Sequence, residues 1–259
     1  MARFRPARLA AGACTLAGVL LLWYASTSLT GWIGPARFPE PVEVWDALRQ
    51  ITVAGYADGR LDQHVLHSCA LVLMGFAAAT AVGVPLGLWM GHSRRAEAFF
   101  NPIFMLIRPI PPLAWIPLAI VWLGLEDASK VMVIWFAAFV PSVINSYVGV
   151  RSIERPVLEA AAMLEVRGAR FVREVVVPGA LPHVFTGLRL SLQASWTTLV
   201  AAELIGALFG LGHVLTQGSL DIYPAMILVA MMAVALCGGL MTAALTWLEQ
   251  ASMPWRFKA

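Results

Sequence analysis

The chain has 259 residues, of which 59% are hydrophobic and only 13% are charged, with a mean hydropathy of +0.76. Soluble domains carry roughly 25% charged residues, so this composition excludes an ordinary soluble domain and indicates a chain embedded in lipid. The net charge of +3 does not indicate a nucleic-acid partner, and the three cysteines lie far apart in apolar segments, without a disulfide or metal pattern.

The first apolar segment, residues 9–30, is long enough to cross a bilayer, which takes about 20 apolar residues. Three arginines precede it, so a cleaved signal peptide is an alternative interpretation. Trp23 and Tyr24 make a poor cleavage site, and we therefore expect a retained helix.

Five more apolar segments follow, and the sequence predicts an all-α membrane protein with a single permease-like domain over residues 1–259. The predicted spans are 9–30, 64–90, 98–124, 130–150, 183–205 and 223–248, with a charged loop at 151–182. Prolines interrupt the third span. Between the first two spans, Val42, Trp45 and Leu48 recur at spacing three, which predicts the apolar face of a short helix outside the membrane.

The distribution of basic residues predicts the orientation. Twelve of the 18 Lys and Arg residues lie in the N-terminal tail, the turn 91–97, the charged loop and the C-terminal tail, whereas the opposite side is rich in Asp and Glu. Cytoplasmic loops carry the excess of Lys and Arg. We therefore expect the charged loop and both termini to lie in the cytoplasm.

The charged loop has the pattern of two short amphipathic helices with Gly168 at the turn between them. Arg170 and Glu174 are four residues apart and predict an ion pair. Pro178 is expected to end the second helix, and Pro182 to open the fifth span in its first turn. Such a pair of helices either rests on the membrane surface or docks into the groove of a partner protein, and periodicity does not separate the two.

Within this loop, residues 159–182 read EAAAMLEVRGARFVREVVVPGALP. An E-A-A followed about sixteen residues later by a hydrophobic residue and proline resembles the EAA motif of permease subunits of ATP-binding-cassette importers. The family usually has glycine where this chain has Glu165, and leucine where it has Val177. The resemblance implies coupling helices that insert into a nucleotide-binding subunit. The expected ATPase-coupling residues are Glu159, Ala160, Ala161, Glu165, Gly168, Arg170, Arg173 and Pro178.

Three further stretches look like permeases for taurine, aliphatic sulfonates and nitrate. They are FPEPVEVWDAL (38–48), RPIPPLAWIPLAIVWLGLEDASK (108–130) and GLRLSLQASWTTLVAAELIGALFGLG (187–212). The resemblance covers about residues 38–215. It implies a type I importer permease that moves a small organic anion, with taurine or another sulfonate first and nitrate, an aromatic carboxylate or a vitamin precursor as alternatives.

Arg108 lies near mid-depth of the third span, where a charge costs roughly 2.5–3.5 kcal/mol on insertion scales and should face protein or water. It is either a cation on the path of an anionic substrate or a structural residue that caps carbonyls freed by the proline break. Glu203 either closes a gate by pairing with another helix or lies among the outer headgroups. The expected path residues are Arg108, Pro111, Pro112, Trp115, Trp196 and Glu203.

The chain has no H-E-x-x-H, G-x-S-x-G or G-x-x-x-x-G-K-[ST] motif. We therefore expect no catalytic residue, no metal site and no cofactor in this chain, with ATP and Mg bound by a partner ATPase. A single coupling loop predicts a homodimer serving two ATPase subunits. The resemblance adds a periplasmic binding protein and the bacterial inner membrane. A stand-alone secondary transporter, the rival, predicts matching broken helices in both halves, and only the third span looks interrupted.

Overall fold

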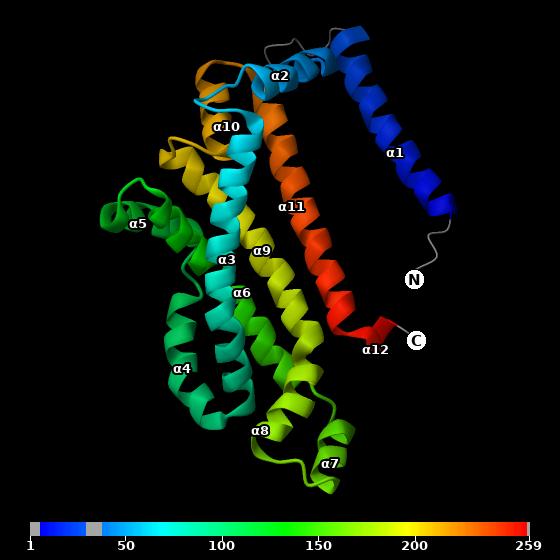
Figure 1. The fold of residues 1–259 in the computed structure, drawn as a ribbon, viewed down its shortest axis with the longest axis vertical. Helices are drawn as coiled ribbons and strands as arrows, with labels where there is room; N and C mark the ends of the chain where they lie inside the picture. The colour runs from blue at the N-terminus through cyan, green and yellow to red at the C-terminus, as the bar shows by residue number, and fades with distance from the viewer. Residues whose placement is uncertain (1–5, 30–37, 258–259) are drawn as a thin grey trace.

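A computed structural model describes residues 6–29 and 38–257, and every regular element among these residues is a helix, as the sequence predicts (Figure 1). The helices are α1 (Pro6–Tyr24), α2 (Pro41–Val53), α3 (Leu61–His92), α4 (Arg94–Ile107), α5 (Ile116–Leu123), α6 (Asp127–Arg151), α7 (Arg155–Met163), α8 (Gly168–Phe171), α9 (Val177–Gly206), α10 (Leu211–Leu220), α11 (Pro224–Ser252) and α12 (Pro254–Phe257). Three short turns join them: the π-helical turns η1 (Ala25–Leu29) and η3 (Val172–Val176), and the 3₁₀ turn η2 (Pro112–Trp115).

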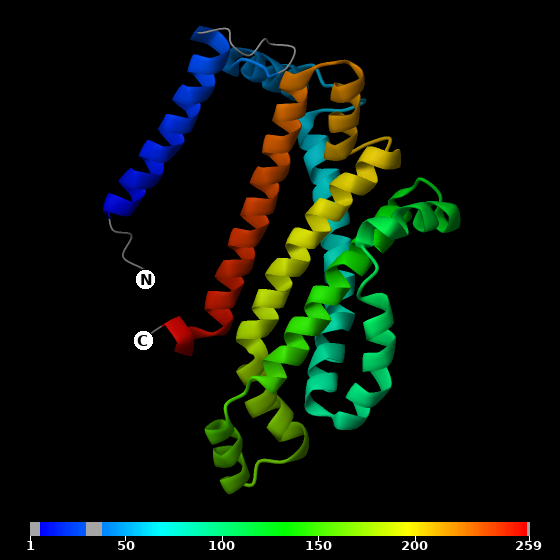
Figure 2. The same cartoon turned by 180° about the vertical axis from the view of Figure 1, so that it is seen from behind.

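The bundle is built from α3, α6, α9 and α11, with α2 and α10 at one end and α7 and α8 at the other (Figures 1 and 2). Glycines on α3 face α6 and allow the two backbones to approach closely. A Cβ atom added at Gly83 would lie 2.0 Å from Ser142 Oγ, and one at Gly87 would lie 2.4 Å from the carbonyl oxygen of Val143. Small residues at such contacts are typical of helix pairs in membranes.

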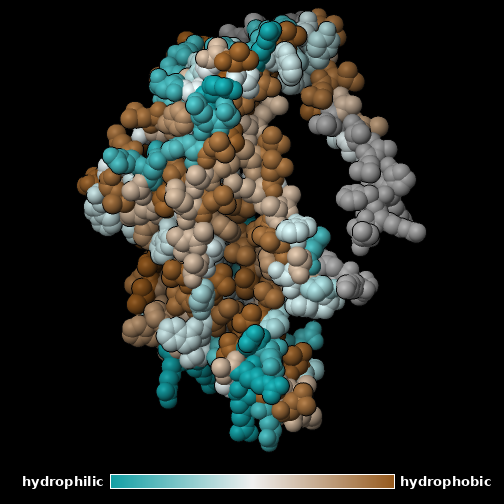
Figure 3. All heavy atoms as spheres, in the orientation of Figure 1, coloured by the Kyte–Doolittle hydropathy of each residue, from teal (hydrophilic) through white to brown (hydrophobic). Residues whose placement is uncertain are grey.

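A hydrophobic band separates two polar ends of the molecule (Figure 3). Four helical segments are long and apolar enough to cross a membrane: α3, α6, the helix from Gly168 to Gly206, and α11. A fifth crossing is reached if α4 and the η2–α5 helix form one bent span. The apolar helical stretch described around α1, Ala17–Leu29, is shorter than a membrane crossing requires. The count of six spans therefore stays a prediction.

The third predicted span is broken where its prolines lie, as expected from the sequence. Helix α4 ends at Ile107, the next helical turn begins at Pro112, and the two segments meet at 80°. Prolines lack the N–H that would continue the helical hydrogen bonds. As a result α5 runs sideways from the bundle (Figure 1).

Helix α2 forms as predicted, and of its predicted apolar face Leu48 packs against the bundle while the other two residues do not. Val42 and Trp45 are 61% and 66% exposed, whereas Val44, Ala47 and Ile51 are buried against α11. Both faces carry apolar residues, and contact with α11 selects the one on which the small Ala47 permits close packing. Residues 30–37, where the outer segment begins, and the basic positions in 1–5 and 258–259 lie outside the described residues.

The second helix of the charged loop does not end at Pro178, so this prediction is wrong. From Gly168 the chain is helical without interruption to Gly206, and Pro182 lies inside α9 rather than in its first turn. Directly before α9, residues 172–176 form the π-helical turn η3. This wider turn lies where the ring of Pro178 would clash with the carbonyl four residues earlier, so the helix continues past the proline.

Candidate functional site

Glu165 replaces the glycine of the EAA motif and nevertheless adopts the backbone conformation that glycine favours. Its φ is +52°, and it ends α7 in a Schellman motif. Here the N–H of Val166 donates to the carbonyl of Ala161 at 3.0 Å, and the N–H of Glu165 donates to the carbonyl of Ala162 at 3.1 Å. Gly168, with φ of +61°, makes a second left-handed turn at the start of α8. The loop thus needs two such turns between its helices.

The surface of α7 is largely uncovered. Glu159 and Ala160 are exposed, whereas Ala161 is buried. At the tip, Met163 is 85% and Leu164 is 76% exposed. Large apolar side chains exposed at a helix tip are typical of a surface that meets a partner.

The second part of the loop carries the predicted ion pair, which the structure confirms. The Arg170 Nε donates to both carboxylate oxygens of Glu174 at 3.0 Å. Arg173 is exposed on the same segment, and Pro178 is partly buried at the start of α9. The coupling residues therefore lie together at the α7–α8 end of the molecule (Figure 2).

At the break between α4 and α5 lies a cavity of about 200 Å³. Arg108, Pro112 and Trp115 line it, whereas Pro111 is exposed and adjacent in sequence. The Trp115 ring stacks on Phe136 of α6, with centroids 4.2 Å apart and planes 6° from parallel. The structure thus brings three of the predicted path residues to one cavity.

The side chain of Arg108 makes no hydrogen bond or ion pair with any other residue in the described ranges, and it is exposed. The other cations on the long helices differ. Arg189 pairs with Glu249 of α11, and Lys130 Nζ lies 3.0 Å from Asp127 Oδ1. Each of these two cations thus has an acidic partner within the described residues.

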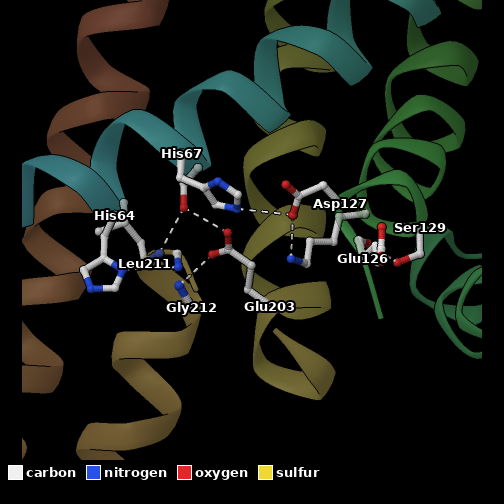
Figure 4. A network of polar contacts seen from close by, with 11 residues as sticks. His64, His67, Glu126, Asp127, Ser129, Glu203, Leu211 and Gly212 are labelled. Carbon is white, nitrogen blue, oxygen red and sulfur yellow. Dashed lines mark hydrogen bonds and ion pairs between the residues drawn. The ribbon is translucent and has the colours of Figure 1, made fainter. Parts of the chain in front are cut away.

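Glu203 is the centre of a polar cluster at the α10 end of the bundle (Figure 4). Its side chain is buried, and it receives hydrogen bonds from the Ser68 hydroxyl at 2.9 Å and the N–H of Gly212 at 2.7 Å. Ser68 Oγ in turn accepts from the N–H of Leu211 at 2.9 Å. Glu203 and Ser68 thereby bind the first N–H groups of α10, which its own backbone leaves unpaired.

His64 completes this arrangement. Its Nδ1 accepts from the N–H of Gly210 at 3.2 Å, its Nε2 lies 3.1 Å from the carbonyl oxygen of Tyr56, and its ring stacks on Phe209. Close to the same cluster, His67 Nε2 lies 3.3 Å from Asp127 Oδ1. These contacts connect α3, α6, α9 and α10 at their common end.

The remaining path residue, Trp196, is apart from the Arg108 cavity. It is buried in the hydrophobic core with Leu71, Leu199 and Cys237, and its indole N–H has no hydrogen-bond partner among the described residues. Sequence reasoning missed Ser68 and Gly212 as partners of Glu203, and Glu249 as the partner of Arg189. The spacing of residues far apart in the chain carries no signal for such pairs.

Comparison with known proteins gives the family. The family described as binding-protein-dependent transport system inner membrane component matches residues 83–256. The chain belongs to this family. It is accordingly a multi-pass inner-membrane component of an ATP-binding-cassette importer, and such a component works with ATPase and substrate-binding partners.

Three relatives extend over almost the whole chain. The taurine transport system permease protein TauC of Escherichia coli is 35% identical over 93% of this chain and 88% of its own length. The bicarbonate transport system permease protein CmpB of Synechococcus elongatus is 30% identical over 90% of this chain and 85% of its own length. The putative aliphatic sulfonates transport permease protein SsuC of Bacillus subtilis is 28% identical over 92% of this chain and 84% of its own length.

Proposed function

We propose that this chain is the membrane-spanning subunit of an importer that carries a small organic anion, first of all taurine or another sulfonate, from periplasm to cytoplasm by alternating access. The observation that carries this proposal is the match to a taurine permease over 93% of the chain. The similarity to a sulfonate permease agrees with it.

The assembly we propose contains two copies of the chain, two cytoplasmic ATPase subunits and one periplasmic binding protein. The exposed tip of α7 supports ATPase docking, because Met163 and Leu164 have no cover within the described chain. ATP and Mg are bound by the ATPase subunits, and this chain hydrolyses nothing. The charged loop and both termini lie in the cytoplasm, consistent with the basic residues at the α7–α8 end.

In this proposal, closure of the ATPase dimer moves the coupling residues and switches the bundle between two global states. The substrate path runs beside the third and fifth predicted spans. Arg108, Pro111, Pro112 and Trp115 border it on the third span. The two path residues predicted on the fifth span, Trp196 and Glu203, are buried in this structure and would support the path from behind. Family membership argues against a transporter that works without partners.

Bicarbonate is the second candidate substrate, and the similarity to CmpB favours it. Bicarbonate is an anion and taurine is a zwitterion with an anionic sulfonate, so an unpaired cation suits the anionic group of either. They differ in their apolar portion, which taurine has and bicarbonate lacks.

Uptake by the complete importer in proteoliposomes tests the proposal. Labelled taurine should accumulate only when ATP is inside the cytoplasmic compartment and binding protein is outside. Excess ethanesulfonate should compete, and excess bicarbonate should not. Accumulation of bicarbonate without taurine would replace the substrate assignment, and taurine uptake by the chain alone would refute the importer assembly.

Coupling is tested separately with Glu159→Ala and Arg173→Glu in the same vesicles. Both residues are exposed, so neither change removes a core contact. ATP hydrolysis should persist while taurine uptake falls, because the ATPase no longer moves the bundle. Coupled uptake at the wild-type rate in both variants would remove the docking role of the loop.

A further inference from the structure

The cavity at the α4–α5 break combines an unpaired cation with an apolar wall. We propose that it is a binding subsite in the permease itself for a small anion with a short apolar portion, of which an alkanesulfonate is the type. The inference rests on the proposed import of an organic anion and adds that the permease, not only its binding protein, contacts the substrate.

The first argument is the charge of Arg108. Helix α4 has 14 residues and rises about 21 Å from its first turn, so Arg108 at its end lies deep within a ~30 Å hydrocarbon core. An intramembrane cation is normally paired, as Arg189 and Lys130 are here. Arg108 has no such partner in the described part of the chain, and the exposed guanidinium can therefore bind an anion directly.

The second argument is the local backbone. The η2–α5 helix begins at Pro112, within the same cavity, so the positive end of its dipole lies beside Arg108. Half-helices of broken spans direct this end toward anionic substrate groups in transporters. Among the described residues that line the cavity, none is acidic.

The third argument is size and surface. The volume of about 200 Å³ is below the roughly 300–1,000 Å³ of drug-sized pockets and suits a small anion. Trp115 stacked on Phe136 forms one wall, and Ala194 of α9 lines the cavity as well. This apolar surface suits methylene groups, which bicarbonate does not have.

Charge-selective thiol labelling of Ala194→Cys in the complete importer tests the subsite. In a background with Cys14, Cys69 and Cys237 changed to alanine, the introduced thiolate displaces methanesulfinate from a methanethiosulfonate reagent and forms a mixed disulfide. The anionic sulfonatoethyl reagent should react faster than its trimethylammonium counterpart. Arg108→Gln should lower the ratio of the two rates at least roughly tenfold, because a cleft of one charge raises counter-ion encounter by about 10–10³.

Three controls keep the result specific. Arg108→Lys should retain most of the rate ratio, and Arg49→Gln, which removes an exposed arginine of α2, should leave it unchanged. At equal concentrations, ethanesulfonate should slow the reaction of the anionic reagent with the introduced cysteine more than bicarbonate does. An unchanged ratio in Arg108→Gln, equal protection by bicarbonate, or no reaction with either reagent would each overturn the subsite.

Taurine uptake by the wild-type importer in the same vesicles separates the two proposals. Uptake without charge selectivity at position 194 leaves the import function standing and refutes the subsite. Charge selectivity with ethanesulfonate protection, but without sulfonate uptake, supports the subsite and refutes the substrate assignment.

Discussion

Glu203 and Arg108 are both charged residues within predicted spans, and the protein accommodates them in opposite ways. Glu203 is 1% exposed, and its carboxyl oxygens accept hydrogen bonds from the Ser68 hydroxyl and from the N–H of Gly212 in the first turn of α10. Arg108 lies at a helix break, is exposed and has no partner among the described residues. A buried carboxyl group whose two oxygens are each hydrogen-bonded fixes structure, whereas an exposed cation without a partner remains available to a ligand.

The largest expected effect lies in the Glu203 cluster. Glu203→Ala leaves the Ser68 hydroxyl and the Gly212 N–H buried without an acceptor, at about 1–3 kcal/mol each, so we expect a loss of roughly 3 kcal/mol in the free energy of unfolding. Glu203→Gln keeps an acceptor oxygen and should lose less than half of that. Chemical denaturation in detergent measures both. Equal stability of Glu203→Ala and wild type would contradict a structural role for the cluster.

A pair of arginine variants sharpens the comparison. Arg189→Gln removes the ion pair with the buried Glu249 and should cost roughly 2 kcal/mol, below the 3–5 kcal/mol of fully buried pairs because Arg189 is 34% exposed. Arg108→Gln breaks no described contact and should stay within about 0.5 kcal/mol of wild type. The same denaturation experiment compares them. A cost at Arg108 equal to that at Arg189 would make Arg108 a structural residue.

The next largest change in stability is expected at Glu165. A side chain in the left-handed conformation costs roughly 1–2 kcal/mol, which glycine avoids. Glu165→Gly should therefore raise stability by about 1 kcal/mol, whereas Glu174→Gly, at a helical position of the same loop, should lower it. Thermal unfolding of the two variants gives the comparison. Destabilisation by Glu165→Gly would show that its side chain has a role that the backbone does not explain.

The smallest effect concerns pH at the α10 end. Burial first, and then its hydrogen bond of 2.5 Å to Asp221 Oδ2, raise the pKa of the Tyr56 hydroxyl above its ordinary value of about 10. Because the pKa is raised in the folded state, this stabilisation is present below pH 10 and is lost as the pH rises above it.

Tyr56→Phe should accordingly cost about 1 kcal/mol at neutral pH and show a shallower loss of stability between pH 10 and 12. Tyr24→Phe, at an exposed tyrosine of α1, serves as the control. If the free energy of unfolding of Tyr56→Phe and of the wild type changed with pH in the same way, the Tyr56 hydroxyl would not contribute to the pH dependence of stability.

Local patterns sufficed to predict much of this protein. The apolar segments predict the long helices, the prolines after Arg108 predict the break, and the spacing of Arg170 and Glu174 predicts their ion pair. Each of these depends on neighbours within one or two helical turns.

What the sequence did not yield depends on contacts between distant residues. Ser68 and Glu203 are 135 positions apart, and Arg189 and Glu249 are 60 apart, so no periodicity connects them. The buried face of α2 was missed for the same reason, since α11 decides which of its two apolar faces is covered. The passage of the helix through Pro178 depends on a π-helical turn that composition does not encode.

The ratio of ATP hydrolysed to taurine imported, measured for Arg108→Gln and wild type in proteoliposomes with binding protein present, tests the central claim most directly. If Arg108 serves the substrate and not the fold, uptake should fall at least roughly tenfold while binding-protein-stimulated ATP hydrolysis stays near the wild-type rate, so the ratio rises by the same factor. An unchanged ratio, with both rates normal or both reduced together, would contradict the account.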